Sequence, residues 1–184
     1  MLEIASAAVR GGAEVIQLRH KSMARGELLT LARDMREVVR EALFIVNDYV
    51  DIALIAAADG AHLGPDDMSI GAARRLAHEG FLVGASASNP DTARSAINAG
   101  ADYIGSGPAF ATPVKKEKSV IGPAGVAAVA AAVEVPVFAI GGIDGSNVAQ
   151  LTALGLHRVC VIRTLADAPD PEQAARRLRA MLDD

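Results

Sequence analysis

Cysteine pairs, tryptophan and membrane-length apolar runs are all lacking in this chain of 184 residues. The single cysteine, Cys160, lies in an apolar run, so an internal disulfide is excluded and we expect a buried thiol in a reducing compartment. No apolar stretch approaches the roughly 20 residues that span a bilayer. The first residues open an amphipathic helix pattern and do not resemble a signal peptide. We therefore expect a cytoplasmic protein with no membrane partner.

An excess of one charge is lacking as well. Lysine and arginine together number 18 against 22 aspartates and glutamates, and the formal net charge of −4 is spread along the chain. The composition therefore gives no reason to expect nucleic acid or an anionic membrane as a partner. A phosphorylated ligand would need a local group of positive charges. With 51% apolar residues, the chain can bury one core, and we expect a single barrel domain over residues 1–184.

One pattern recurs along the chain: a helical segment rich in alanine ends at glycine, and a short aliphatic run follows. Glycine suits this position because its backbone enters the left-handed region without a Cβ clash. The runs are almost continuously apolar, which is typical of strands covered on both faces. The strand candidates cover residues 12–18, 43–47, 60–64, 80–84, 100–105, 136–140 and 155–162.

Segments with helical periodicity separate these runs. A first amphipathic helix opens near Met1. A last helix begins after Asp170, which can cap it, while Pro171 and Glu172 suit its first turn. The remaining helix candidates cover residues 27–41, 70–78, 91–99, 123–133 and 147–154.

Alternating helices and parallel strands fit either an open doubly wound sheet or a closed barrel. The spacing favours an α/β fold of the TIM type, a (βα)8 barrel without its first β-strand, because the chain starts with the helix that would follow that strand. Exposed sheet edges are then expected at the opening. The connection between Val39 and Leu43 is short for this fold, so we expect a few residues to be lacking there too.

Polar residues follow the first strand candidate, at the end where barrels of this kind place their active sites. Alternation along the strand sends Gln17, Arg19 and Lys21 to one side. Two cations and an amide at a strand end can hold a diphosphate and a polar ring. The alternative is an ordinary solvated edge.

Carboxylates follow the next two strand candidates. Asp48 comes directly after one of them, and Asp66 and Asp67 come shortly after the other. Carboxylates from adjacent strand ends can bind Mg²⁺, which keeps several waters and bridges to substrate phosphate. Taken alone, the pair at 66–67 would fit a helix N-cap equally well. Their proximity to Asp48 favours the metal site.

Later strand candidates deliver further polar groups. Ser86 follows one strand but lacks the surroundings of an activated nucleophile. The long connection over residues 105–122 offers the hydroxyl of Thr112 and several lysines, of which we select Lys115. Backbone N–H groups around residues 141–142, next to residues 162–164 of the following strand end, suit a phosphate site.

Taken in order, these motifs resemble thiamine-phosphate synthase over essentially the whole chain. Each motif is short, but their order makes the set specific. The matching segments are residues 17–21, 45–48, 50–54, 58–64 with Asp67, 84–86, 100–108, 111–115 and 139–143.

The resemblance implies a transferase of thiamine biosynthesis. It would condense 4-amino-2-methyl-5-hydroxymethylpyrimidine diphosphate with 4-methyl-5-(2-hydroxyethyl)thiazole phosphate, giving thiamine phosphate and pyrophosphate. Mg²⁺ is the implied cofactor, held by Asp48 and Asp67, and Arg19, Lys21 and Lys115 are the implied catalytic cations. The implied contacts to the pyrimidine diphosphate are Gln17, Leu18, Arg19, His20, Lys21, Asn47, Ser86 and Lys115. The implied thiazole-phosphate contacts are Thr112, Val114, Gly142, Ile162 and Arg163.

Two positions depart from the family's pattern, and several alternatives stay open. Val114 stands where the family usually has threonine, and Arg163 stands where it usually has serine; the arginine could replace a lost hydroxyl contact with a bidentate one. A related thiazole tautomerase would need a histidine where this chain has residues 107–109. A non-catalytic barrel that binds thiazole or thiamine phosphate would not need the metal carboxylates, and an isomerase of aromatic amino-acid synthesis would need an acid–base pair. The pattern leaves both a monomer and a homo-oligomer open.

Overall fold

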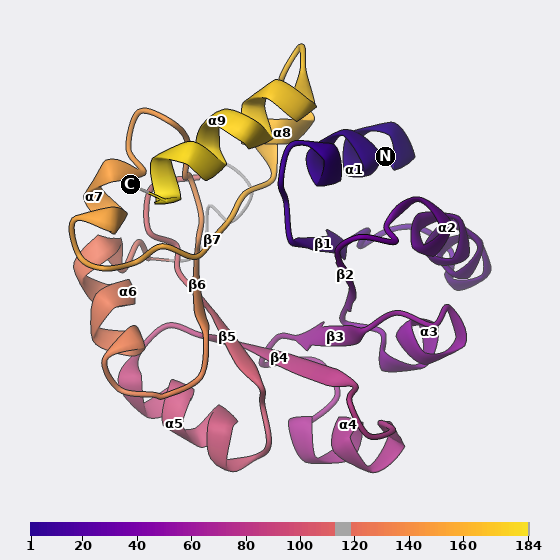
Figure 1. The fold of residues 1–184 in the computed structure, drawn as a ribbon. Helices are drawn as coiled ribbons and strands as arrows, with labels where there is room; N and C mark the ends of the chain where they lie inside the picture. The colour runs from indigo at the N-terminus through magenta and orange to yellow at the C-terminus, as the bar shows by residue number, and fades with distance from the viewer. Residues whose placement is uncertain (113–118, 184) are drawn as a thin grey trace.

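The computed structural model describes residues 1–112 and 119–183, and in these ranges seven parallel strands alternate with helices. The strands pair in their order along the chain, from β1 to β7, and curl into an open barrel with the helices outside (Figure 1). The predicted α/β barrel is confirmed. The strands are β1 (Val15–Leu18), β2 (Leu43–Asn47), β3 (Gly60–Leu63), β4 (Leu82–Ala87), β5 (Tyr103–Ser106), β6 (Val137–Ile140) and β7 (Val159–Cys160).

The helices largely follow the predicted segments. Asp170 caps the last helix as predicted, since it accepts the N–H of Gln173 at 2.9 Å. Two short helices, α3 and α8, were not among the predicted ones. In the described part of the chain, none of the helices has the length and apolar character needed to cross a membrane. The helices are α1 (Leu2–Arg10), α2 (Arg25–Val38), α3 (Val50–Ile55), α4 (Ile70–Leu76), α5 (Pro90–Asn98), α6 (Gly122–Ala130), α7 (Ala149–Thr152), α8 (Arg163–Ala166) and α9 (Pro171–Asp183).

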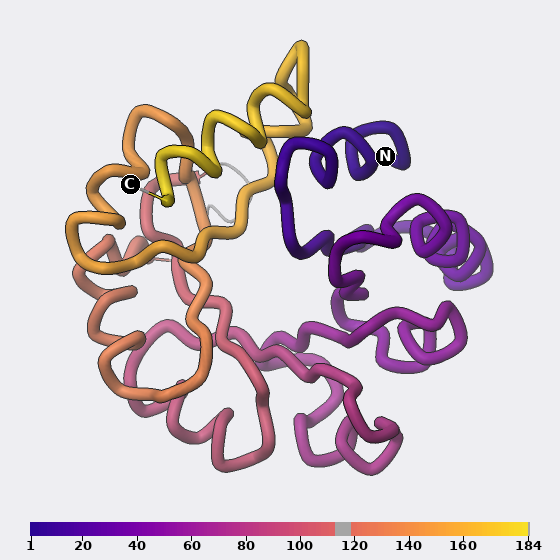
Figure 2. The backbone as a smooth tube through the Cα atoms, in the orientation of Figure 1, coloured from indigo at the N-terminus to yellow at the C-terminus, as the bar shows by residue number. Residues whose placement is uncertain are grey.

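The sheet is open between β1 and β7, but the outer helical layer is not. Within the described ranges, neither of these edge strands pairs with a further strand on its outer side, while α1 and α9 lie side by side across the opening (Figure 2). Gly11 permits this approach, because an added Cβ would lie 2.4 Å from the carbonyl oxygen of Glu172. An ion pair of 2.7 Å joins Arg10 to Glu172. Helix packing therefore closes the ring where strand pairing does not.

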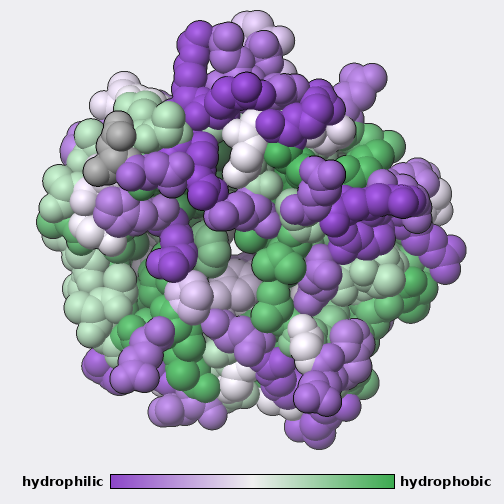
Figure 3. Space-filling model, viewed as in Figure 1, coloured by the Kyte–Doolittle hydropathy of each residue, from purple (hydrophilic) through white to green (hydrophobic). Residues whose placement is uncertain are grey.

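The view along the barrel shows how polar and apolar residues are distributed. In the space-filling view a hollow lies near the centre, and both hydrophilic and hydrophobic residues border it (Figure 3). The barrel interior therefore contains polar groups, and the main apolar core lies between the sheet and the helices.

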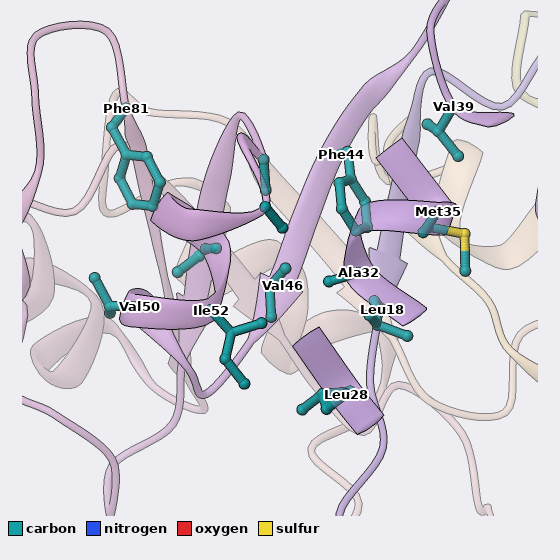
Figure 4. Close-up of a cluster of buried hydrophobic side chains, with 14 of the residues drawn as sticks. Leu18, Leu28, Ala32, Met35, Val39, Phe44, Val46, Val50, Ile52 and Phe81 are labelled. Carbon is teal, nitrogen blue, oxygen red and sulfur yellow. The ribbon is translucent and has the colours of Figure 1, made fainter. Parts of the chain in front are cut away.

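Strand β2 illustrates how alternation divides the two sides of the sheet. Phe44 and Val46 pack among the side chains of the surrounding helices, including Leu28 of α2 (Figure 4). Ile45 and Asn47 have the opposite orientation, toward the barrel interior. All four are at least nine-tenths buried, which explains the almost continuous apolar character of the run.

The short connection before β2 closes without additional residues. The Arg36 guanidinium donates to the carbonyl of Val39 and, at 3.5 Å, to that of Ala42, so one side chain of α2 holds the segment against the helix end. The short connection is therefore closed by a side chain, and the expectation that residues are lacking here stays a prediction. A side chain that reaches past the end of its own helix provides the hydrogen bonds that a longer loop would otherwise supply.

Candidate active site

All strands are parallel, so their carboxyl ends form one rim of the barrel, here called the carboxyl rim. The opposite end, at the starts of the strands, is the amino rim. Every predicted site residue within the described ranges belongs to the carboxyl rim or to a loop that leaves it, whereas Val114 and Lys115 lie outside those ranges. Residues that are far apart in the sequence therefore share one end of the molecule, as predicted.

Asp48 occupies a sharp backbone turn at this rim. Its φ of 67° lies in the left-handed region, which few residues other than glycine adopt and which aspartate tolerates better than most. The turn is held from both sides. The N–H of Asp48 donates to the carbonyl of His62 on β3, and the N–H of Tyr49 donates to the carbonyl of Asn47, both at 2.9 Å. A strained backbone that is held in place in this way is frequent at functional sites.

Asp67 is held by the start of its own loop. The N–H of Gly64 donates to its Oδ2 at 2.7 Å, and the Asp67 N–H donates back to the Gly64 carbonyl at 3.3 Å. This arrangement brings its carboxyl within hydrogen-bonding reach of Asp48. The two carboxyls come from neighbouring strand ends, as the sequence indicated.

The electrostatics at Asp48 combine opposing effects. Burial, followed by contact with the Asp67 carboxyl, raises the pKa of Asp48, while the charges of Lys21 and Arg19 act in the opposite direction. The raised pKa means that ionised Asp48 lacks sufficient compensation in the chain alone. The same interactions place Lys21 and Arg19 close enough to act on whatever occupies this site.

This donor set suits a hard divalent cation. Two facing carboxylates, one with a raised pKa, provide oxygen ligands and an unfavourable negative charge that a cation would neutralise. Across the described residues, no group of three or more histidine, cysteine, aspartate or glutamate side chains could hold a metal. A metal at Asp48 and Asp67 would therefore complete its shell with water or substrate oxygens, which is the usual behaviour of Mg²⁺.

A hydrogen-bonded chain inside the barrel leads to Ser86, and this chain was missed in the sequence. His62 Nε2 lies 3.0 Å from Ser86 Oγ, and His62 Nδ1 lies 3.3 Å from the hydroxyl of Tyr103. Burial and the neighbouring Cys160 and Asp102 raise the pKa of Tyr103, so its hydroxyl stays protonated. The imidazole thus fixes the orientation of the one polar side chain that the sequence predicted at the end of β4.

Glycine residues leave room for these interior rings. A Cβ on Gly84 would lie 2.0 Å from Cζ of Tyr103, and one on Gly105 would lie 3.0 Å from Cε1 of His62. Small residues opposite large ones on adjacent strands were the available sequence signal. Cys160, expected to be buried, is partly exposed on the same side of the sheet.

Two of the predicted contacts on β1 and its loop have other partners. Leu18 is 1% exposed and packs in the cluster beneath α2, so its side chain faces away from the barrel interior. The Nδ1 atom of His20 accepts the N–H of Met23 at 3.0 Å, which shapes the loop between β1 and α2.

The loop after β6 lies against the segment after β5. Gly141 and Gly142 have φ values of 101° and 64°, and a Cβ on Gly142 would lie 2.5 Å from the carbonyl oxygen of Ala111. Gly142 is therefore next to the segment that carries Thr112, as predicted. Arg163, in contrast, pairs with Asp167 one turn further along α8, at 3.0 Å.

Comparisons with known proteins agree over most of the chain. The model of the family described as thiamine monophosphate synthase matches residues 1–165. The thiamine-phosphate synthase of Methanoregula boonei is 45% identical over 180 residues, which cover 96% of this chain and 83% of the relative. That of Moorella thermoacetica is 45% identical over 98% of this chain and 88% of the relative. A Synechocystis relative of the same name is 42% identical, and the chain spans 54% of its length.

Solved structures agree with the sequence comparison. The thiamine phosphate pyrophosphorylase of Pyrococcus furiosus superposes with a TM-score of 0.91 and 36% identity, over 99% of this chain and 89% of that one. A 3-hexulose-6-phosphate synthase superposes with a TM-score of 0.79 at 19% identity, which shows a shared fold alone.

Proposed function

This chain belongs to the thiamine monophosphate synthase family, and from that membership we propose how its carboxyl rim carries out the reaction. The chain is a thiamine-phosphate synthase, a transferase that releases pyrophosphate. Its substrates are the aminopyrimidine diphosphate and the thiazole phosphate named above. The juxtaposition of Asp48 with Asp67, within reach of Arg19 and Lys21, is the observation that supports this site most strongly.

We propose that the rim beside β1 to β4 holds the pyrimidine diphosphate. Arg19 and Lys21 attract its negative oxygens, and Asp48 with Asp67 would hold Mg²⁺ against them. When bound, the ion would supply positive charge to the diphosphate. Leu18 and His20 contribute through the backbone, since their side chains have other partners. The remaining contacts proposed for this substrate are Gln17, Asn47, Ser86 and Lys115.

We propose that the rim beside β5 to β7 holds the thiazole phosphate. The hydroxyl of Thr112 and the backbone of Gly142 lie on adjacent loops, which suits a phosphate between them. Val114, which has no hydroxyl, stays among the contacts proposed for this substrate. Ile162 and Arg163 contribute backbone groups, because the Arg163 side chain is paired with Asp167.

The arrangement favours a dissociative displacement. The aminopyrimidine can stabilise a cation at the carbon that loses the diphosphate, while Arg19, Lys21 and Lys115 stabilise the negative charge that grows on the departing pyrophosphate. The thiazole nitrogen then attacks that carbon. This nitrogen carries no proton, so the reaction needs no general base. The hydroxyl of Ser86, oriented by His62, holds the pyrimidine ring for the attack.

The direct test uses the purified chain, Mg²⁺ and both substrates, with thiamine phosphate detected by mass spectrometry. We expect product only when the chain, Mg²⁺ and both substrates are all present. A matched reaction with a chelator controls for the metal, and one with the unphosphorylated thiazole controls for the second substrate. Product formation at an equal rate with the chelator would contradict the metal site, and no product under any condition would contradict the proposed function.

A further inference from the structure

At the end of β6 and in the loop after it, the carbonyl groups of residues 140–143 each accept a hydrogen bond. The carbonyls of Ile140 and Gly141 accept the N–H groups of Ala109 and Phe110, at 2.8 and 3.0 Å. The next two carbonyls accept from side chains. Asn147 Nδ2 donates to the Gly142 carbonyl at 2.8 Å, and Thr164 Oγ1 donates to the Ile143 carbonyl at 2.6 Å.

The N–H groups of the same loop show the opposite behaviour. Among the residues that the structure describes, those of Gly141, Gly142 and Ile143 donate to no carbonyl and no side chain. In a trans peptide group the C=O and the N–H point in opposite directions. The carbonyls of residues 140–142 share their peptide groups with these three N–H groups, so anchoring these carbonyls on one side turns the N–H groups to the other side. Such a row of N–H groups provides a concave site for an anion.

The glycines explain why this loop needs anchors. Gly141 and Gly142 have left-handed backbones, and without a Cβ their peptide groups rotate easily. Asn147 restrains two peptide groups together, because its Oδ1 also accepts the N–H of Asp144 at 3.0 Å. Thr164 of α8 restrains the peptide group between Ile143 and Asp144, because its hydroxyl donates to the Ile143 carbonyl.

We propose that Asn147 and Thr164 are positioning residues for the phosphate of the thiazole substrate. Asn147 aims the N–H of Ile143 through the Gly142 carbonyl, and Thr164 holds the next peptide group, whose N–H is bound to Asn147, so that Asn147 keeps this position. This inference rests on the proposed function. It assigns the orientation of the phosphate loop to two side chains that act through the loop carbonyls and do not themselves touch the ligand. Their contribution is therefore specific to the phosphate, and the ring of the substrate does not benefit from it.

The first variant is Thr164→Val, which has the same shape and lacks the hydroxyl donor. Binding to the full chain is measured by calorimetry with two probes, the thiazole phosphate and the thiazole alcohol without phosphate. We expect about a five- to tenfold weaker affinity for the phosphate and an unchanged affinity for the alcohol, as for the loss of one hydrogen bond. Thr164→Ser keeps the donor and should restore the affinity.

A second variant tests the other anchor. Asn147→Asp keeps the oxygen that accepts from Asp144 but places an oxygen against the Gly142 carbonyl, and it should weaken phosphate binding at least as much. In steady-state assays both variants should raise the KM for the thiazole phosphate and leave the KM for the pyrimidine diphosphate unchanged. The matched control is Thr152→Val, whose hydroxyl contacts the Ala149 carbonyl on the surface of α7 and which should bind both probes normally.

The outcomes separate this inference from the proposed function. Equal affinity losses for both probes, or no loss for either, would overturn the positioning role even if the chain makes thiamine phosphate. If Thr164→Val does not fold, Asn147→Asp decides the same question. A wild-type chain that binds neither thiazole probe would instead refute the proposed function.

Discussion

At the amino rim of the barrel, Asp59 and Asp102 each accept hydrogen bonds from an arginine and a backbone N–H, whereas at the carboxyl rim Asp48 and Asp67 face each other. Asp59 accepts from Arg36 at 2.7 Å and from the N–H of Phe44 at 2.6 Å. Asp48 and Asp67 follow the adjacent strands β2 and β3, whereas Asp59 and Asp102 precede β3 and β5, which are separated by β4. The same residue type in the same architecture is fully partnered at one end and left with an unfavourable neighbour at the other.

The amino-rim arrangement is repeated two βα units later. Asp102 accepts from Arg74 and, at 2.7 Å, from the N–H of Val83, and Arg74 also donates to the carbonyls of Phe81 and Gly100. Each aspartate stands immediately before its strand and bonds to the second residue of the preceding strand. These contacts fasten a helix end to two strands. The comparison teaches that the amino rim contributes stability, whereas the carboxyl rim keeps an unfavourable pair of carboxyls, which is the arrangement expected of a ligand site.

The largest expected effect comes from removing a carboxylate at the carboxyl rim. Asp48→Ala should lower kcat/KM by about 100-fold or more, since it removes a proposed metal ligand and, with it, the proposed charge balance around the diphosphate. The matched control, Asp66→Ala, should change kcat/KM by less than about threefold. Steady-state kinetics with both substrates checks this, and equal losses in the two variants would mean that the metal ligands are misassigned.

Removing the corresponding acid at the amino rim should affect stability instead. Asp102→Ala leaves Arg74 and the Val83 N–H without their acceptor, and we expect a loss of about 2 kcal/mol in the free energy of unfolding. Tm should fall by about 4–8 °C, with both KM values unchanged at a temperature where the variant is folded. The control is Asp91→Ala on α5, whose ion pair with Arg94 is exposed and should contribute less than about 0.5 kcal/mol. A raised KM in Asp102→Ala would break the comparison.

A smaller effect should appear when only the charge at the carboxyl rim is removed. The pKa of Asp48 is raised from its ordinary value of 3.8, so between the unfolded pKa and the higher folded one the folded state holds more proton. Stability is therefore lost as pH rises through that window. Without divalent ions at pH 7, Asp48→Asn should raise Tm by about 1–2 °C, a gain reduced by solvent screening. The gain should disappear near pH 3, and Mg²⁺ should stabilise the wild type but not the variant.

The smallest expected effect concerns a rim arginine that already has a partner. Arg163 is paired with Asp167, so Arg163→Ser should change the KM for the thiazole phosphate by less than about twofold. The same assay should show the larger, phosphate-specific change for Thr164→Val. A tenfold rise in KM for Arg163→Ser would show that its guanidinium leaves Asp167 to bind substrate.

The seven strands could be predicted from the sequence because the runs are almost continuously apolar and five of them begin at a glycine that ends a helix-like segment. The helices α3 and α8 could not, because six and four residues are too short to establish a period against neighbouring strands. The closure of the ring by α1 and α9 was also hidden. It depends on contacts between the first and last helices, which no local pattern encodes.

The site was predictable where a single strand end carries the signal. Arg19 and Asp48 follow their strands directly, and Lys21 and Asp67 follow shortly after theirs. Parallel pairing then brings them to one rim. The interior chain from Tyr103 through His62 to Ser86 requires the facing of three strands to be known together. The anchors Asn147 and Thr164 act through main-chain carbonyls, and side-chain chemistry alone does not reveal that.

The left-handed backbone at Asp48 limits which residues can replace it over evolutionary time. Aspartate, asparagine and glycine adopt this conformation most easily, and only the first of them carries a negative charge. A related protein with asparagine at this position would keep the backbone turn and the shape of the side chain, but it would lack the carboxylate that we propose to bind Mg²⁺. Family members without catalytic activity would then have the same backbone structure as the active enzymes. The residue at this position would distinguish the two groups.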